Sequence, residues 1–189
     1  LRGSRADPQL QGTLRLRDAA WNGMAVGSLM LEADWRGLAQ AGNSVRLALG
    51  EARWQDIAGI TLDASLAGSG PAHRIALDAR AADAALGLDC TGALAMADGW
   101  RGECRRVDVA PAAAQAPWHG DRPIRLAWQR KDGELRIEPF CLGRDTAALC
   151  SRRTAVVGAG RLAGITIDGS DIPFAWLRPW LPAGLEADG

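Results

Sequence analysis

The residues with the most definite chemistry in this sequence are four cysteines, which fall into two local pairs. Cys141 and Cys150 flank a segment whose centre, Gly143-Arg144-Asp145, is typical of a hairpin turn. Cys90 and Cys104 flank Asp98-Gly99 in the same way. Cysteines that face one another across a hairpin can form a disulfide, which persists in an oxidising compartment.

Two other roles for these cysteines stay open at this point. Free cysteine is often simply buried, so four separate buried thiols are the main alternative. Zinc is a weaker one, because the spacings are wider than the C-x2-4-C pattern and only His73 and His119 could assist.

A glycine-rich run, Val156 to Ala163, matches the G-x-G-x-x-A form of the dinucleotide-binding fingerprint. That motif requires a helix immediately afterwards, within a β-α-β unit. Here the following residues, 164–169, return to strand-like alternation. We therefore expect a glycine-rich hairpin and no nucleotide or other cofactor.

Catalytic groups are few. With two histidines and no nucleophile motif, acid–base chemistry would fall on carboxylates such as Asp63, Asp78 and Asp89. These alternate with apolar residues, as the solvent face of a strand does, so we expect no enzyme. Trp21 and Trp54, two of eight tryptophans, recur at one repeat position, which favours structural packing at a strand end over carbohydrate binding.

The elements that would position these residues repeat along the chain. Leu14-x-Leu16-x-x-Ala19-x-Trp21 recurs 33 residues later as Leu47-x-Leu49-x-x-Ala52-x-Trp54. Such a period indicates an elongated architecture whose units stack on their neighbours. Period-two alternation predicts half-buried strands. The predicted ranges are 12–17, 26–35, 44–54, 58–67, 73–81, 85–97, 103–110, 123–130, 134–140, 147–151 and 154–167.

We expect an all-β fold: one antiparallel sheet in a single unit over residues 1–189. Eleven strands cannot form a flat sheet, so the sheet closes as a barrel, splits into a sandwich, or folds into an apolar trough. Residues 110–117 are expected to form a loop. A short helix is expected after Ser170 or Asp171, with Ile172, Ala175, Trp176 and Trp180 on one side.

Charge excludes one class of partner. The 22 basic residues balance the 22 acidic ones, and Lys131 is the only lysine, so nucleic acid is not expected to bind. The start of the chain has neither an initiator methionine nor a signal-peptide core. We expect the chain to be a fragment, with any membrane anchor outside it.

Most of the chain resembles the TamB family, and the specific part of the resemblance lies in residues 135–182. The residues that carry the resemblance are Glu138-Pro139-Phe140-Cys141-Leu142, then Ala148-Leu149-Cys150, Gly160 and the leucine–proline segment 172–182, with Trp100-x-Gly102 upstream. Cys90 and Cys104 depart from this pattern. The resemblance implies a "β-taco", a long sheet folded into a trough with a hydrophobic interior.

It further implies a periplasmic bridge anchored in the inner membrane, with a TamA-like outer-membrane protein of the Omp85 family, phospholipid and adjoining segments of the same chain as partners. Phospholipid transfer is then the expected function, and a scaffold for outer-membrane protein assembly by strand pairing is the alternative. The groove is expected to be lined by Leu14, Leu16, Leu29, Leu31, Leu47, Leu49, Ile60, Leu62, Leu66, Ile75, Leu77, Leu86, Leu88 and Leu94.

Overall fold

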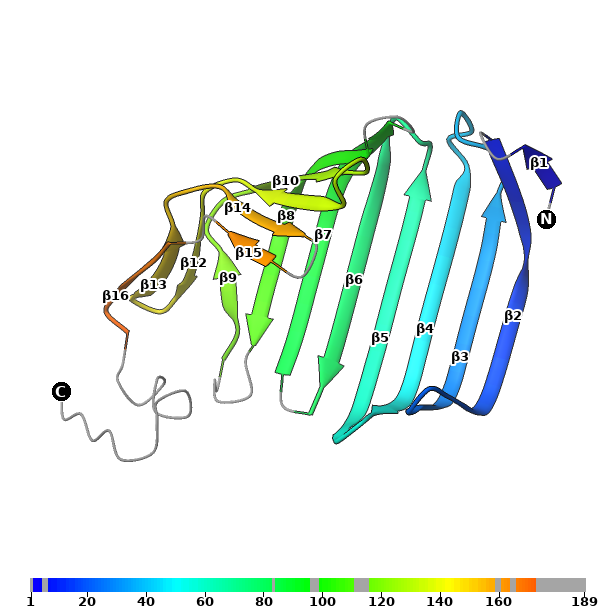
Figure 1. Ribbon diagram of the computed structural model, residues 1–189, viewed down its shortest axis with the longest axis horizontal. Coiled ribbons are helices and arrows are strands. Elements are labelled where there is room, and N and C mark those ends of the chain that lie inside the picture. The colour runs from blue at the N-terminus through cyan, green and yellow to red at the C-terminus, as the bar shows by residue number, and fades with distance from the viewer. Residues whose placement is uncertain are drawn as a thin grey trace.

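The computed structural model is a single curled sheet of sixteen strands (Figure 1). It describes residues 2–4, 7–82, 84–95, 99–110, 116–158, 161–163 and 166–172. The expected C-terminal helix and most of the expected 110–117 loop lie outside these ranges. The long strands are β2 (Asp7–Trp21), β3 (Met24–Trp35), β4 (Asn43–Trp54), β5 (Ile57–Gly68), β6 (His73–Ala81), β7 (Ala84–Ala95) and β8 (Gly99–Ala110). The shorter ones are β1 (Arg2–Ser4), β9 (Trp118–Gly120), β10 (Ile124–Gln129), β11 (Glu134–Ile137), β12 (Phe140–Arg144), β13 (Ala147–Ser151), β14 (Ala155–Gly158), β15 (Arg161–Ala163) and β16 (Ile167–Ser170).

Most predicted strands are found within two residues of their expected bounds, and the exceptions have local causes. The predicted strand 103–110 begins four residues earlier, at Gly99, because β8 pairs with both β7 and β10 from that residue onward. β2 is much longer than the predicted 12–17, because it pairs with β3 up to the turn at Asn22-Gly23. The predicted strand 134–140 ends at Ile137, and Phe140 begins β12. The predicted strand 154–167 is three strands, of which β14 and β15 form the expected glycine-rich hairpin.

The sheet is an antiparallel meander from β1 to β8, and it forks at β8. The first half of β8 pairs with β10, which continues through β11 and β14 to β15. The second half pairs with β9 at Asp108 and Val109, which continues through β12 and β13 to β16. Short strands therefore form two branches at one end of a sheet built from long strands.

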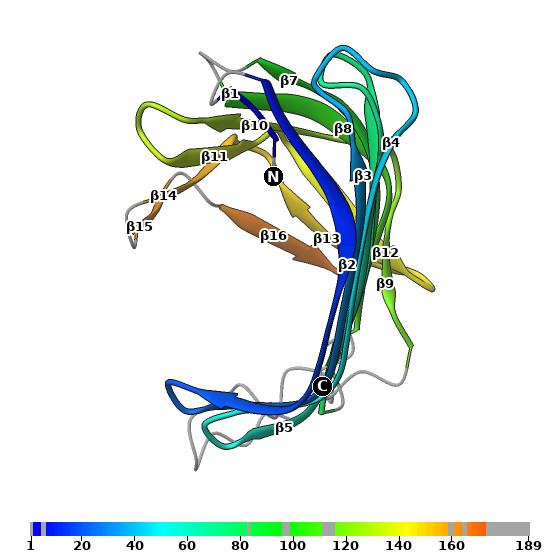
Figure 2. The same cartoon turned by 90° about the vertical axis from the view of Figure 1, so that its right-hand side faces the viewer.

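Seen end on, the sheet has a C-shaped cross-section (Figure 2). The ends of the β2–β3 and β4–β5 hairpins turn to one side at the bottom, and β7, β8, β10 and β11 arch to the same side at the top. The lower bend coincides with left-handed backbone at Asp18 (φ 49°), Glu51 (φ 54°) and Gly59 (φ 68°) on β2, β4 and β5. The register between β4 and β5 shifts at this level, as expected for β-bulges that bend a sheet. The sheet is thus an open trough, one of the three predicted closures.

Burial identifies which face lines the trough. Residues directly opposite one another in a ladder point to the same face, so the register assigns every strand residue to a side. Among the described strand residues, every buried side chain belongs to one face, which is therefore the concave one, and we call it the inner face. These residues are Val26, Ala33, Asn43, Ala52, His73, Cys90, Cys104, Trp118, Ile124, Arg144, Ala147, Ser151 and Ala155.

Candidate functional site

The inner face carries continuous rows of aliphatic side chains that cross from strand to strand. All fourteen residues predicted to line a groove lie on this face, since the ladder places them opposite one another or an even number of residues apart. The register brings twelve of them into three rows, and Ile60 and Leu94 lie in the flanking rows. Contact with a ligand stays a prediction for each of them.

Three rows make up this aliphatic band. The lower row is Leu16, Leu29, Leu49, Leu62, Ala79, Leu86 and Val109. The central row is Leu14, Leu31, Leu47, Ala64, Leu77, Leu88 and Val107. The upper row is Gly12, Ala33, Val45, Leu66, Ile75, Cys90, Cys104 and Ile124.

Most of the aliphatic band is open to solvent. Its leucines are half-buried or exposed, and Leu14 and Leu16 retain 47% and 41% of their surface. A soluble monomer rarely exposes a contiguous apolar surface larger than a few hundred Å². Within the band, the buried residues are Ala33 and, near the fork, Cys90, Cys104 and Ile124. The band therefore has the character of a binding surface rather than of a filled core.

At the upper end of the inner face, polar side chains form hydrogen bonds with one another and with the backbone. His73 is buried at the start of β6, and its Nδ1 lies 3.0 Å from the carbonyl oxygens of both Ser69 and Gly70. The Trp100 indole Nε1 donates to His73 Nε2 at 2.7 Å. Because Nε2 accepts a hydrogen bond, the imidazole proton lies on Nδ1. Both ring nitrogens are thus used within the protein.

The same end, which we call the upper rim, continues through the neighbouring loops. Buried Asn43 donates from Nδ2 to the Gly37 carbonyl at 2.6 Å and accepts from the Arg36 N–H at 2.7 Å. The Gly70 N–H donates to the Leu38 carbonyl, which joins the β3–β4 loop to the β5–β6 loop. Asn43, Gly37, Leu38, Ser69, Gly70, His73 and Trp100 define the upper rim.

Two glycines form the seat of Trp100. Gly92 and Gly102 are opposite one another in the ladder between β7 and β8. A Cβ on Gly92 would lie 2.5 Å from Trp100 Cζ2, and one on Gly102 would lie 2.6 Å from Cη2. The indole therefore covers both glycines and reaches His73 because neither glycine has a side chain, an aromatic–glycine pairing known in sheets.

The lower end differs from the upper rim. Below the bend, Trp21, Met24, Trp54 and Ile57 form one row of opposed residues, which we call the tryptophan lip. The two register shifts between β4 and β5 place Ala52 opposite Ile60 and Trp54 opposite Ile57, which keeps this row on the inner face. The predicted position of Trp21 and Trp54 at strand ends is confirmed, but the predicted packing is wrong. Their exposed fractions are 73% and 51%, because the turns at Asn22-Gly23 and Gln55-Asp56 end the sheet there.

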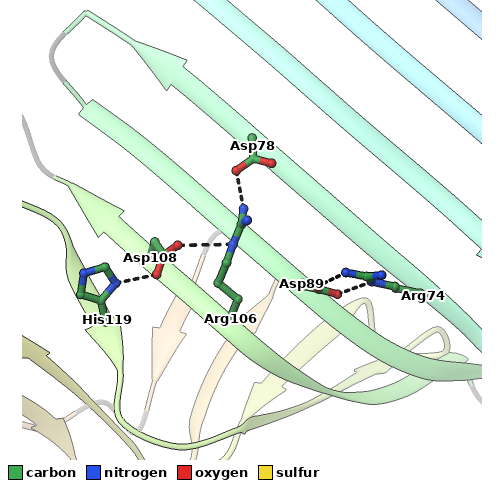
Figure 3. Close-up of polar contacts among 6 residues, drawn as sticks. All are labelled: Arg74, Asp78, Asp89, Arg106, Asp108 and His119. Atoms are coloured by element: carbon green, nitrogen blue, oxygen red, sulfur yellow. Dashed lines mark hydrogen bonds and ion pairs between the residues drawn. The ribbon is translucent and has the colours of Figure 1, made fainter.

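The outer face is polar. Arg106 on β8 bridges two carboxylates, donating to Asp78 on β6 and lying 3.3 Å from Asp108 Oδ2 (Figure 3). His119 Nδ1 lies 2.7 Å from the other oxygen of Asp108. Arg106 crosses β7 above Gly87, where a Cβ would lie 2.8 Å from its Nη2. These four charged or polar groups tie β6, β8 and β9 together on the side away from the trough.

A second outer-face contact is the bidentate pair between Arg74 and Asp89 (Figure 3). Its hydrogen bonds hold the pKa of the Asp89 carboxyl below its usual value. The hydrogen bond from Arg36 likewise lowers the pKa of Asp34. The carboxylates at Asp78 and Asp89 are therefore ion-pair partners, and Asp63 is exposed on the same face, as predicted for a solvated surface.

Both predicted cysteine pairs are disulfides. Cys90–Cys104 lies in the upper row of the inner face, and its two residues are buried. Cys141–Cys150 joins β12 to β13, and its register places it on the outer face. The buried-thiol and zinc alternatives are therefore wrong for these cysteines. Within the described ranges, no group of three or more His, Cys, Asp or Glu is placed to hold a metal ion.

Three features of the site were not predicted from the sequence. His73 and Trp100 were not expected to meet, because they are 27 residues apart and only the sheet register joins them. The tryptophan lip was not predicted because Trp21 and Trp54 belong to different copies of the repeat. The bulge at Arg105 puts Cys104 and Arg106 on opposite faces although their numbers have the same parity. For the position of Trp100, the sequence offered one signal, which is the presence of Gly92 and Gly102 near this tryptophan.

Comparison with known proteins identifies the family to which this sequence is similar. The family model described as "TamB, N-terminal domain" matches residues 1–189, the whole of the sequence. No solved structure matches the chain. The part of the chain that the structure describes has no helix with the length and apolar character needed to cross a membrane. Because the family model covers the full sequence and the structure is the open β-trough expected for it, the chain belongs to the TamB family of cell-envelope proteins.

Proposed function

We propose that this chain forms a segment of a periplasmic bridge that carries phospholipid between the inner and outer membranes and so supports outer-membrane biogenesis. The observation that carries the proposal is the aliphatic band, which is continuous across seven long strands and open along most of its length. The polar atoms of Asn43 and His73 at the upper rim are hydrogen-bonded within the protein, and the ion pairs of β6, β7 and β8 lie on the outer face. An acyl chain on this band would leave water without any protein rearrangement.

The lining suits movement better than tight binding. Burial of acyl methylenes stabilises a bound lipid by about 0.8 kcal/mol each. The lower and central rows consist only of leucine, alanine and valine, so they offer no charged or hydrogen-bonding anchor at any one place. A lipid can therefore slide from strand to strand at nearly constant energy. Its headgroup would lie at the open side of the trough, and no covalent step is needed.

The remaining parts of the proposal follow from the family and the disulfides. Two disulfides suit the oxidising periplasm. We place the inner-membrane anchor outside this chain, and we propose adjoining segments of the same protein and a TamA-like Omp85-family outer-membrane protein as its partners. The protein acts here as a conduit and not as an enzyme.

A second function, a scaffold that assists outer-membrane proteins by strand pairing, has one observation in its favour. Within the described residues, β1 covers only positions 7–9 of β2, so the edge of β2 from Leu10 to Trp21 has a ladder on one side alone. Such an edge can accept another strand. It equally suits an adjoining segment of the same sheet, so we rank this function below lipid transfer.

Charge substitutions separate the two functions in the full-length protein. Leu62→Asp places a charge in the lower row, and Ser65→Asp places the same charge on the outer face of β5, opposite Arg46. A conduit loses activity in Leu62→Asp and keeps it in Ser65→Asp, measured as outer-membrane integrity at equal protein level. Leu77→Glu in the central row should behave like Leu62→Asp.

A scaffold gives the opposite pattern. It tolerates one inward charge but fails when proline is placed in the free edge strand, as in Thr13→Pro. Normal activity in Leu62→Asp together with loss in Thr13→Pro would therefore contradict lipid transfer and support strand pairing.

A further inference from the structure

We propose that phospholipids lie across the trough, parallel to its strands, with the headgroup at the tryptophan lip and the ends of the acyl chains toward the upper rim. This inference rests on the proposed lipid transfer and adds an orientation to it. It follows from the different chemistry of the two ends of the strands and from the depth of the aliphatic band between them.

The tryptophan lip has the composition of a membrane interface. An indole combines a large apolar ring with one N–H donor, and tryptophan gathers where hydrocarbon meets polar headgroups. Trp21 and Trp54 are exposed on the inner face, one on each side of Met24 in the same row. Neither indole N–H has a hydrogen-bond partner among the described residues. Both donors are thus available to the ester and phosphate oxygens of a lipid.

The upper rim offers no such contact. The polar atoms of the Asn43 and His73 side chains are bonded to backbone or to Trp100. The Leu94 N–H donates to the Gly70 carbonyl at 2.7 Å, which fixes the β5–β6 loop against β7. A headgroup placed here would have to break these buried hydrogen bonds and leave buried polar atoms without partners, which is unfavourable. An acyl chain end needs no hydrogen bond and can pack against the Trp100 ring without breaking any of them.

The distance between the two ends fits a lipid lying across the strands. The aliphatic part of β2 runs from Ala19, just above the lip, to Gly12 in the upper row, which is seven residue steps. At about 3.3 Å per residue this is roughly 23 Å of wall. One monolayer contributes half of the ~30 Å hydrocarbon core of a membrane, about 15 Å. The acyl chains therefore fit between the tryptophan lip and the upper rim.

Two photoreactive phosphatidylethanolamine probes test the orientation on the purified full-length protein. One carries a diazirine on the headgroup and the other at the end of an acyl chain, and the labelled peptides are identified by mass spectrometry. We expect the headgroup probe to label the hairpin ends at Trp21–Met24 and Trp54–Ile57. We expect the chain-end probe to label peptides that contain Leu66, Ile75 or Trp100.

Variants add a second measurement. In Trp21→Ser/Trp54→Ser, headgroup labelling of the two hairpins should fall about tenfold, the equivalent of ~1.4 kcal/mol, while chain-end labelling of Ile75 persists. Trp128→Ser, at the far side of the inner face in line with Trp100, is the matched control and should leave headgroup labelling unchanged.

The outcomes separate this inference from the proposed function. Labelling of the inner face by both probes without separation, or with the positions exchanged, would overturn the orientation and leave lipid transfer standing. Equal losses in the Trp128 control and in the double variant would also overturn it. Absence of inner-face labelling by either probe would overturn lipid transfer and the orientation with it.

Discussion

Substitution of Gly92 by alanine should destabilise the upper rim far more than an ordinary glycine-to-alanine change in a strand. The new Cβ would lie 2.5 Å from Trp100 Cζ2 and 2.7 Å from the Arg101 carbonyl oxygen. Since backbone cannot move aside cheaply, the indole must leave its seat. Its 2.7 Å hydrogen bond to His73 is then lost, and buried Nε2 has no donor.

The magnitude follows from these two consequences. A lost hydrogen bond that leaves a buried polar atom unsatisfied costs about 1–3 kcal/mol, and overpacking of a close-packed site costs a similar ~1–3 kcal/mol. We therefore expect a loss of about 2–4 kcal/mol in the local stability of β6, β7 and β8. Gly143→Ala is the matched control, because its nearest neighbour is 4.0 Å away. Its effect should stay within about 0.5 kcal/mol.

Hydrogen exchange of the full-length protein, read by mass spectrometry, measures this loss as faster exchange of the β6–β8 amides. A double-mutant cycle isolates the cause: in a Trp100→Leu background, Gly92→Ala should cost much less than in the wild type, since the indole is no longer there to displace. If Gly92→Ala and Gly143→Ala exchange alike, or if the cost is the same in both backgrounds, the seat of Trp100 does not hold the upper rim.

Three further results are expected. In a graded reductant series followed by alkylation and mass spectrometry, half-exposed Cys141–Cys150 should open before buried Cys90–Cys104; the reverse order would contradict the burial of the inner-face bond. Replacing both Cys90 and Cys104 by alanine should lower stability by about 3 kcal/mol, from the length of the loop they close, and an unchanged urea midpoint would refute this. The Arg74 hydrogen bonds lower the pKa of Asp89 in the folded state. The pair therefore stabilises the fold at pH values above the usual carboxyl pKa of ~3.9, and this stabilisation is lost as the pH falls through the lowered pKa. Asp89→Asn should thus be less stable than the wild type at neutral pH by under ~1 kcal/mol, with the two denaturation curves converging in acid; a gap that widens in acid would show the wrong sign.

Much of this fold could be predicted from the sequence because period-two alternation reports directly on which face of a strand is buried. Alternation through Leu62, Ala64 and Leu66 marks the inner side of β5 without any reference to other strands. The local disulfides were also accessible, since each joins strands that are neighbours in sequence. The closure of the sheet was not, because apolar alternation is common to barrel, sandwich and trough, and the family resemblance made that choice.

The misses lie where alternation is interrupted. The bulge at Arg105 reverses the faces of the residues after it, so Arg106 could not be assigned to the outer cluster with Asp78 by counting from Cys104. The left-handed residues Asp18 and Glu51 lie at the bend, and below it the sheet ends beside the exposed tryptophans. A tryptophan at a strand end looks the same in the sequence whether the sheet buries it or ends beside it.

Site-specific photo-crosslinking in cells tests the central claim most directly, with the photoreactive residue placed in the full-length protein at Leu62 or at its neighbour Asp63. The register puts Leu62 in the lower row of the inner face and Asp63 on the outer face opposite Asp78. A phospholipid trough predicts lipid adducts at position 62 and none at position 63. Protein adducts alone at position 62, or equal lipid capture at both positions, would contradict it.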